Sequence, residues 1–489
     1  MKNIKTIIIA ALLMICFIFM ACSPETVNSN ESKDDQSPVN TPDEIAETTE
    51  SYYDALGERS FNGDTFTVLD SCHHPHLHVN FPPDGEITGE PINDALYNRD
   101  KFIEEKYDVT LEYILMHGFG DGCRALEKSV LAGVHEYDLI VSPVFGTSLD
   151  VISTRNVLYN MMETPYLSLQ SPWWSKMIYE NMQFNGRLYY TGGDIFLPSY
   201  SQCPAVTVYN KKLLKDYGIE DNLYSLVFEG KWTLDALNEI IKDRDIDLNS
   251  DGKMHADDDF YGLITQNITV TTSFYLAGVG VNFSTGTNDT INVGLTSPVN
   301  LTKIDRLSEI LKRVNYRDQE DPIQKTFKGN RALFLTHCMI SPQLNLRDME
   351  EDYGILPMPK WDQNQESYVS FLNAWGSGFV GIPLNADIEK SGFLTEAMAY
   401  AGYEMLRRPV YDITFKAKGA RDEESEKIID IIIETAYLDI GGVYNFGGIQ
   451  EMLLNTIIDD KPFVSAYEKK EGAIQRDIDK FIDAMSENN

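Results

Sequence analysis

The chain has 489 residues, with 75 Asp and Glu against 41 Lys and Arg, which gives a formal net charge of −34. A charge of this size repels nucleic acid and anionic bilayers, so it argues against a nucleic-acid partner and disfavours polyanionic substrates. At roughly 100 to 200 residues per domain, the length predicts two or three domains that need no disulfide support. Neutral and cationic ligands remain.

The first 22 residues have the pattern of an export signal. Lys2 and Lys5 precede an apolar run over residues 7–20, and Ala21 and Cys22 lead into polar sequence. A spanning helix needs about 20 apolar residues, so an uncleaved transmembrane anchor is the weaker alternative. Residues 19–22, Phe-Met-Ala-Cys, resemble the lipobox of bacterial lipoproteins, although that family usually has Leu where Phe19 stands. The resemblance implies that Cys22 is lipidated and anchors the protein at the extracellular face of the cell membrane.

The next segment, residues 23–62, is expected to be a flexible acidic tether. Residues 23–60 hold ten acidic and two basic residues among mostly polar ones. Such a segment buries too little apolar surface to offset its ordering entropy, although residues 45–56 could form a short helix.

Four cysteines remain after Cys16 and Cys22 are set aside: Cys72, Cys123, Cys203 and Cys338. They form no CxxC pair. In an exported protein they could oxidise in three pairings, or they could stay as single buried thiols.

From residue 65 onward, strands and helices are expected to alternate. The expected order is a strand over 66–69, a helix over 92–106, a strand over 111–115, a helix over 122–131 and a strand over 137–141. This order predicts a parallel sheet covered by helices on both faces. Ligands of such sheets bind at the carboxyl ends of the strands, which here means the loops that begin at Asp70, Met116 and Ser142.

A second α/β region is expected to begin near Ala205. Residues 206–209 alternate like a strand, and Asn210 can cap a helix over 211–217. Thr233 can cap another helix over 234–242, whose apolar residues share one face.

Several short segments, taken together in their order and spacing, carry a family resemblance. They are Gly-Glu-Pro-Ile-Asn-Asp-Ala at 89–95, Tyr-Asn-Lys at 209–211, Gly-Lys-Trp-Thr at 230–233, Phe-Lys-Gly-Asn-Arg-Ala-Leu-Phe at 327–334 and Asp-Tyr-Gly-Ile-Leu-Pro-Met-Pro-Lys at 352–360. With them, nearly all of the chain after residue 64 resembles the extracellular solute-binding lipoproteins of bacterial ABC importers, in the carbohydrate-binding group related to maltose-binding protein.

The resemblance implies an α/β, two-lobed periplasmic-binding-protein-like fold of type II, with a hinge and a ligand cleft between the lobes. By that analogy lobe 1 comprises residues 63–200 and 330–372, and lobe 2 comprises residues 201–329 and 373–489. The chain crossings would lie near residues 199–204, 327–334 and 371–377.

A calcium-loop motif occupies residues 247–258. Asp247, Asn249 and Asp251 offer side-chain oxygens at positions 1, 3 and 5, Gly252 permits the turn at position 6, and Lys253 offers its carbonyl at position 7. Asp258 stands at position 12, where the template has Glu, and the adjacent Asp259 is the alternative closing ligand. The pattern predicts a structural calcium site in lobe 2, away from the ligand; an acidic turn without metal is the other interpretation.

Aromatic residues in expected loops indicate sugar binding. A sugar ring packs its C–H face on an aromatic ring, while its hydroxyls bond to side-chain oxygens and amides. Core packing is the competing interpretation, and it is favoured for Trp232, which opens a helix. The expected ligand-binding residues are Trp375, Trp173, Trp174, Asp194, Tyr200, His74 and Asn373.

Residues 72–78 concentrate four of the eight histidines beside Cys72. Zinc or copper binding, ligand hydrogen bonding and a merely polar loop are the three interpretations of this run. The lack of a second cluster and of helical His spacing argues against the metal.

Catalytic motifs are missing from the sequence: it has no Gly-x-Ser-x-Gly elbow, phosphate-binding loop or His-Glu-x-x-His. Together with the family resemblance, the export signal with Cys22, the tether and the aromatic loops, this predicts a non-enzymatic, monomeric binding protein that captures a neutral saccharide or oligosaccharide for the transmembrane subunits of an ABC permease. It would close around its ligand, bridging both lobes. The alternatives are a secreted glycoside hydrolase or lyase that uses Asp194 with a second carboxylate, and a surface sensor or adhesin with the same fold.

Overall fold

The computed structural model describes most of the chain from residue 52 onward. Residues 52–62, which the sequence analysis places in the flexible tether, belong instead to the folded body, because they include helix α1 (Tyr52–Leu56) with its buried Tyr53. The described residues are 52–71, 85–118, 120–196, 203–219, 223–255, 258–266, 269–286, 290–312, 316–318, 325–339, 346, 349–410, 423–459 and 461–487. Cys22, Cys72, His74 and Tyr200 lie outside them. Within these ranges, no helix is long and apolar enough to cross a membrane.

The first sheet has the expected βαβαβ core. Its strands β1 (Asp64–Asp70), β2 (Val109–Leu115) and β3 (Leu139–Ser142) are parallel, and they are linked by the helices α2 (Pro91–Tyr107) and α3 (Asp121–Leu131). The sheet order is β10-β3-β1-β2, in which β10 (Phe379–Gly381) runs antiparallel to β3. Local chemistry starts α2: Pro91 occupies its first turn, and the Glu90 carboxylate accepts hydrogen bonds from two amides of that turn.

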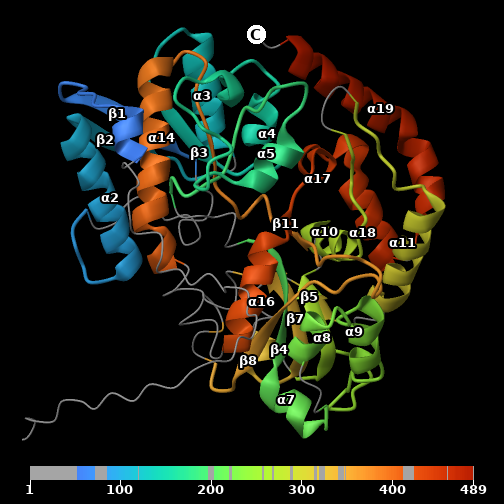
Figure 1. The fold of residues 1–489 in the computed structure, drawn as a ribbon. Coiled ribbons are helices and arrows are strands. Elements are labelled where there is room, and N and C mark those ends of the chain that lie inside the picture. The colour runs from blue at the N-terminus through green and yellow to red at the C-terminus, as the bar shows by residue number, and fades with distance from the viewer. Residues whose placement is uncertain are drawn as a thin grey trace, which may run out of the picture. The chain divides into compact units, whose positions relative to one another are not determined.

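A late helix, α14 (Ile388–Met405), packs against α2 of this first lobe. Figure 1 shows α14, in orange, beside the blue α2. Two glycines of α14 allow it to pack closely on the backbone at Asp194 and Pro165. A Cβ at Gly402 would overlap the carbonyl oxygen of Asp194, and a Cβ at Gly392 would overlap that of Pro165. The smaller elements of this lobe are α1 (Tyr52–Leu56), α4 (Leu149–Ile152), η2 (Met161–Glu163) and α5 (Lys176–Met182).

The second sheet has five strands in the order β6-β5-β7-β4-β8. They are β4 (Ala205–Asn210), β5 (Tyr261–Gln266), β6 (Tyr316–Asp318), β7 (Ala332–Cys338) and β8 (Tyr353–Pro357). Strand β4 is antiparallel to both of its neighbours and is buried at every position, not only at alternate ones. A fully buried strand is the consequence of a sheet that is covered on both faces.

Two helices of the second lobe begin at the capping residues that the sequence predicts. Asn210 Oδ1 caps α7 by accepting from Leu213 N at 2.9 Å, and Thr233 Oγ1 caps α9 by accepting from Ala236 N at 3.2 Å. The helices of this lobe are α7 (Lys211–Asp216), α8 (Leu223–Phe228), α9 (Leu234–Ile241), α10 (Thr269–Gly278), α11 (Pro298–Leu311), α16 (Glu423–Glu434) and α18 (Ile449–Asp459).

The sheet topology corrects the expected division into lobes. Strands β7 and β8 belong to the second sheet, so residues 332–357 are part of lobe 2, and β5 continues to β7 without a crossing near 327–334. Strand β10 and α14 belong with the first sheet, whereas the expected division places residues 373–489 in lobe 2. The chain therefore changes sheet between β3 and β4, between β8 and β10, and between α14 and α16.

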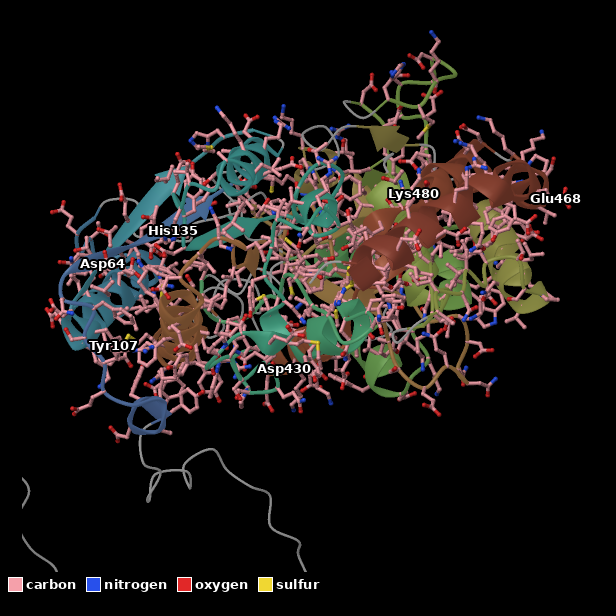
Figure 2. All side chains as sticks on the ribbon, turned by 90° about the horizontal axis from the view of Figure 1, so that it is seen from above. Asp64, Tyr107, His135, Asp430, Glu468 and Lys480 are labelled. Carbon is pink, nitrogen blue, oxygen red and sulfur yellow. The ribbon has the colours of Figure 1, made fainter. Side chains whose placement is uncertain are left out.

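The remaining elements lie close to these crossings or at the C-terminal end. A two-stranded pair joins β9 (Ser370–Phe371) to β11 (Ala436–Tyr437), followed by α17 (Ile440–Tyr444), η4 (Phe446–Gly448) and α19 (Phe463–Glu487). Helix α19 is amphipathic. Phe481 packs on Phe184 of the first lobe with ring centroids 5.3 Å apart, whereas the charged Glu468 and Lys480, labelled in Figure 2, are solvent-facing residues of the same helix.

Candidate binding site

The carboxyl ends of the three parallel strands lie side by side in the first lobe. Ser71 N, after β1, donates to Val141 O at 2.8 Å, and Met116 N, after β2, donates to Asp70 O at 2.8 Å. Gly122, in the first turn of α3, lies so close to Ser71 that a Cβ there would overlap the Ser71 side chain. These contacts bring together the loops that the sequence analysis predicts as ligand loops.

The crossing segment 373–377 joins this edge. Val144 N, in the loop after β3, donates to Ala374 O at 3.3 Å, and Asn373 N donates to Cys203 O at 2.9 Å. The Asn373 side chain then shapes the segment, because its Oδ1 accepts from Trp375 N at 3.2 Å. Trp375 is therefore carried by a loop that is bonded both to the strand ends of lobe 1 and to the start of lobe 2.

Trp375 differs in its surroundings from the three buried tryptophans. Trp173, Trp174 and Trp232 are buried members of the hydrophobic core, whereas Trp375 is half-buried beside the strand-end loops. A half-buried ring can still offer apolar surface to a ligand, so Trp375 has the setting expected of a sugar-stacking residue.

Trp173 and Trp174 share a buried carboxylate. Glu396 of α14 accepts from Trp173 Nε1 at 3.1 Å, from Trp174 Nε1 at 2.8 Å, and from the Tyr52 hydroxyl at 2.7 Å. Burial raises the pKa of the fully enclosed Glu396, while these donors oppose the shift. The two indoles thus hold α14 and α1 to the first lobe in this conformation, and their contact with ligand stays a prediction.

Asp194 is fully buried behind the Trp173 backbone. Its amide donates to Trp173 O at 2.8 Å, and Arg407 Nε lies 4.0 Å from its Oδ2. A fully enclosed carboxylate is out of reach of a polymeric substrate unless the surrounding chain moves. Its role as a ligand acceptor, or as the acid of a hydrolase, stays a prediction.

Tyr444 is a residue that sequence reasoning did not select. Its hydroxyl lies 2.9 Å from Ser153 Oγ and accepts from the Tyr190 hydroxyl at 3.3 Å, so α17 reaches the first lobe at the C-terminal end of α4. Burial raises the pKa of Tyr444 to about 12, so the hydroxyl stays protonated at neutral pH. The available signal was the glycine-rich sequence around it, Gly-Gly-Val-Tyr-Asn-Phe-Gly-Gly at 441–448.

Glycines and a buried acid hold α17 against the second lobe. A Cβ at Gly442 would lie 3.0 Å from the Phe371 ring, and Asp439 caps the helix by accepting from Gly442 N at 2.6 Å. Asp439 also accepts from Phe283 N at 2.9 Å, and its burial raises its pKa to about 6. Helix α17 is therefore anchored to the second lobe, while the hydroxyl of its Tyr444 bonds to the first lobe.

The predicted calcium loop has a turn built on its side-chain oxygens. Asp247 Oδ2 accepts from Gly252 N at 2.8 Å, and Asp251 Oδ1 accepts from Lys253 N at 2.8 Å. The Asn249 amide donates to Asp258 Oδ2 at 2.9 Å, which places position 12 next to position 3. Within the described residues, no three His, Cys, Asp or Glu side chains converge as a metal-binding group.

Asp259 has a structural role in that loop. It is fully buried, and its two carboxylate oxygens accept from Leu248 N at 2.9 Å and from His255 N at 2.6 Å. Because Asp259 ties the two ends of the loop together, Asp258 is the better placed of the two acids to face an ion. The donor set consists of hard oxygens, which suits calcium.

Solved structures with the same fold are solute-binding proteins. An ABC substrate-binding protein from Listeria monocytogenes, in complex with cycloalternan, is 12% identical, with a TM-score of 0.54 over 87% of this chain and 99% of that one. A cyclo/maltodextrin-binding protein complexed with maltotetraose is 14% identical, with a TM-score of 0.55 over 87% of this chain and 97% of that one.

An ABC transporter solute-binding protein from Thermotoga lettingae, bound with α-D-tagatose, is 15% identical, with a TM-score of 0.52 over 86% of this chain and 100% of that one. No family model and no curated protein matches the sequence. The fold is accordingly the two-lobed α/β fold of periplasmic solute-binding proteins, as the sequence analysis predicts.

Proposed function

We propose that this protein is the substrate-binding lipoprotein of an ABC importer and captures a neutral saccharide or oligosaccharide. The observation that carries the proposal is the half-buried Trp375 on a crossing segment that is bonded to the strand ends of one lobe and the first residues of the other. The solved proteins of the same fold, whose bound ligands are cycloalternan, maltotetraose and tagatose, support a saccharide as the ligand class.

The proposed mechanism is capture by closure. Ligand would contact the strand-end loops of lobe 1, Trp375 on the crossing and Tyr444 from α17, so that it stabilises a closed arrangement of the lobes. Trp375 would stack on a sugar face, and hydroxyl and amide groups around it would bond to the sugar hydroxyls. Small-angle scattering at saturating ligand should then show a smaller radius of gyration than the ligand-free protein; an unchanged radius with a tight ligand would contradict closure.

A thermal-shift panel tests the ligand class. A ligand that binds only the folded state raises the melting temperature, so maltotetraose, cycloalternan, tagatose, amino acids and short peptides can be compared directly. We expect a saccharide to give the shift, and a response to peptides alone would refute the proposal.

Trp375→Ala tests the site, with Trp361→Ala as the matched control, because Trp361 is also half-buried but packs near Lys303. Losing one stacking interaction worth about 1 to 2 kcal/mol should weaken the affinity for the responding sugar roughly five- to thirtyfold. We expect this loss in Trp375→Ala and not in Trp361→Ala. Equal sugar affinities in the two variants would show that Trp375 does not contact the sugar.

The hydrolase alternative predicts turnover. Labelled oligosaccharides should be recovered intact after incubation with this protein, and appearance of shorter products that Asp194→Asn abolishes would favour the hydrolase or lyase. The sensor or adhesin alternative has the same fold but lacks a permease partner, so cross-linking of the ligand-loaded protein to permease subunits in the native membrane separates it from the proposal.

The proposal includes attachment to the extracellular face of the membrane through lipid on Cys22. The charged, apolar and polar order of residues 1–25 supports it. A Cys22→Ser variant should lose the lipid mass and partition into the aqueous phase of a detergent separation.

A structural calcium ion is the last part of the proposal. Asp247, Asn249 and Asp251 would supply side-chain oxygens, Lys253 its carbonyl, and Asp258 would close the shell. Chelator should lower the melting temperature while leaving sugar affinity intact below the new midpoint, and Asp247→Ala should abolish the response to chelator. A melting temperature that chelator leaves unchanged would reduce the loop to an acidic turn.

A further inference from the structure

Two cysteines that are far apart in sequence lie on one face of the second sheet. The antiparallel β4–β7 register places Ala205 opposite Cys338, and Met339 N extends the ladder by donating to Pro204 O at 2.9 Å. Cys203 precedes Ala205 by two residues, so it shares that face and is the diagonal neighbour of Cys338. Both cysteines are buried thiols, and a hydrogen bond with the Cys338 side chain is the largest cause of the raised pKa of Cys203.

The Cys203 thiol also supports the crossing segment that carries Trp375. Cys203 Sγ donates to Gly376 O at 3.0 Å, and Cys203 O accepts from Asn373 N at 2.9 Å. The packing is tight, because a Cβ at Gly376 would lie only 3.0 Å from Cys203 Sγ. The S–H group is therefore a hydrogen-bond donor beneath the segment 373–377.

We propose that Cys203 and Cys338 are an oxidisable thiol pair, and that their oxidation to a disulfide releases the 373–377 segment. The oxidant is a small-molecule disulfide. A sulfur of the pair attacks it and forms a mixed disulfide, and the second sulfur then displaces the bound half, so that a Cys203–Cys338 bond forms and the oxidant leaves as two thiols. The two protein thiols lose two electrons and two protons in total.

A nearby imidazole can assist the proton transfer. His337 Nδ1 lies 3.4 Å from Cys338 Sγ and already accepts from Cys338 N at 2.9 Å, so it faces the sulfur as an acceptor. Cys338 is accordingly the attacking thiol, and the more deeply buried Cys203 is the resolving one. Diagonal neighbours across a ladder lie about 7 to 8 Å apart, so closing the bond requires a backbone shift at Cys203, whose carbonyl is bonded to Asn373 N.

Oxidation removes the donor beneath Gly376. A disulfide sulfur has no hydrogen, so Gly376 O loses the bond from Cys203 and the segment that holds Trp375 is less restrained. This redox pair stands on its own geometry, whereas an effect on sugar capture rests on the proposed function.

The test uses the purified full chain, refolded with reduced or oxidised glutathione and mapped by alkylation and peptide mass spectrometry. The expected result is a Cys203–Cys338 peptide pair lighter by two hydrogens in the oxidised sample. Hydrogen exchange of a peptide covering 372–378 should be about three- to tenfold faster in that sample, the factor of one lost hydrogen bond. Neither readout needs a sugar, so failure of the sugar panel would leave this inference intact.

Variants separate the bond from its consequence. Cys203→Ser keeps an O–H donor for Gly376 O and cannot oxidise, so its exchange should stay slow in both buffers, whereas Cys203→Ala should exchange fast in both. Cys123→Ser is the matched control: Cys123 is a buried thiol bonded to Ser142 Oγ at 3.4 Å, and its loss should leave the crosslink unchanged. Absence of the Cys203–Cys338 peptide, pairing of either cysteine elsewhere, or equal exchange in the oxidised and reduced samples would overturn the proposal.

Discussion

Replacing Glu396 with Leu should destabilise the first lobe strongly, because this one buried carboxylate serves four donors from α1 and the 168–174 loop. It accepts from Trp173 and Trp174 at 3.1 and 2.8 Å, from Ser168 N at 3.2 Å, and from the Tyr52 hydroxyl at 2.7 Å. The two indole N–H groups are buried, and each would lose its partner without reaching water. At about 1 to 3 kcal/mol for each unsatisfied donor, offset by relief of the buried charge, the expected loss is roughly 3 to 5 kcal/mol.

Urea denaturation followed by circular dichroism measures this loss as a lower midpoint at unchanged slope. Tyr52→Phe is the matched control, since it removes one donor and leaves the carboxylate with the other three; about 1 kcal/mol is expected. Glu396→Gln should fall between the two, because its amide keeps one acceptor oxygen. A Glu396→Leu midpoint as high as that of Tyr52→Phe would refute the view that this carboxylate holds α14 and the tryptophan pair together.

Three further predictions concern buried groups. Burial raises the pKa of Asp439 from 3.8 to about 6, so the folded state holds this proton more tightly than the unfolded chain. The free energy of unfolding should therefore fall by on the order of 3 kcal/mol from this group as pH rises from about 4 to about 6. Asp439→Asn should flatten that part of a denaturation–pH profile. Asn210→Ala removes the cap on Leu213 N and should lower unfolding free energy by about 1 to 2 kcal/mol in urea, while a change below about 0.3 kcal/mol would show that the cap is dispensable. Gly402→Ala should cost about 1 to 3 kcal/mol or more, because its Cβ would overlap the Asp194 carbonyl; a melting temperature equal to that of wild type would mean that α14 can shift.

Local signals in the sequence located many elements correctly. The first three parallel strands and their two helices were predicted because their periodicity and the polar turns between them are local, and each element spans only 4 to 17 residues. The caps at Asn210 and Thr233 were predicted for the same reason, since a capping side chain bonds to an amide three residues ahead.

The division into lobes could not be obtained in this way. Strand β10 has three residues and pairs with β3, more than 230 positions earlier, and β7 inserts between β4 and β5. A strand's own residues determine its periodicity but leave open which edge it joins, because any backbone can supply the ladder hydrogen bonds. The expected crossing near residues 327–334 was wrong for this reason, because β7 joins the same sheet as β5.

The candidate site, too, could be predicted only in part from the sequence. Sequence composition selected Trp375 and Asn373 as polar and aromatic residues of a loop, and the structure places both at a crossing between the lobes. The same reasoning could not separate them from Trp173 and Trp174, because a tryptophan's chemistry is identical in a core and in a site. Burial decides that difference, and burial depends on Glu396, more than 220 residues further along the chain. The sequence by itself therefore determined the elements, their caps and the candidate aromatic residues, whereas tertiary packing alone decided which indoles stay half-exposed and which two thiols lie on one face of the second sheet.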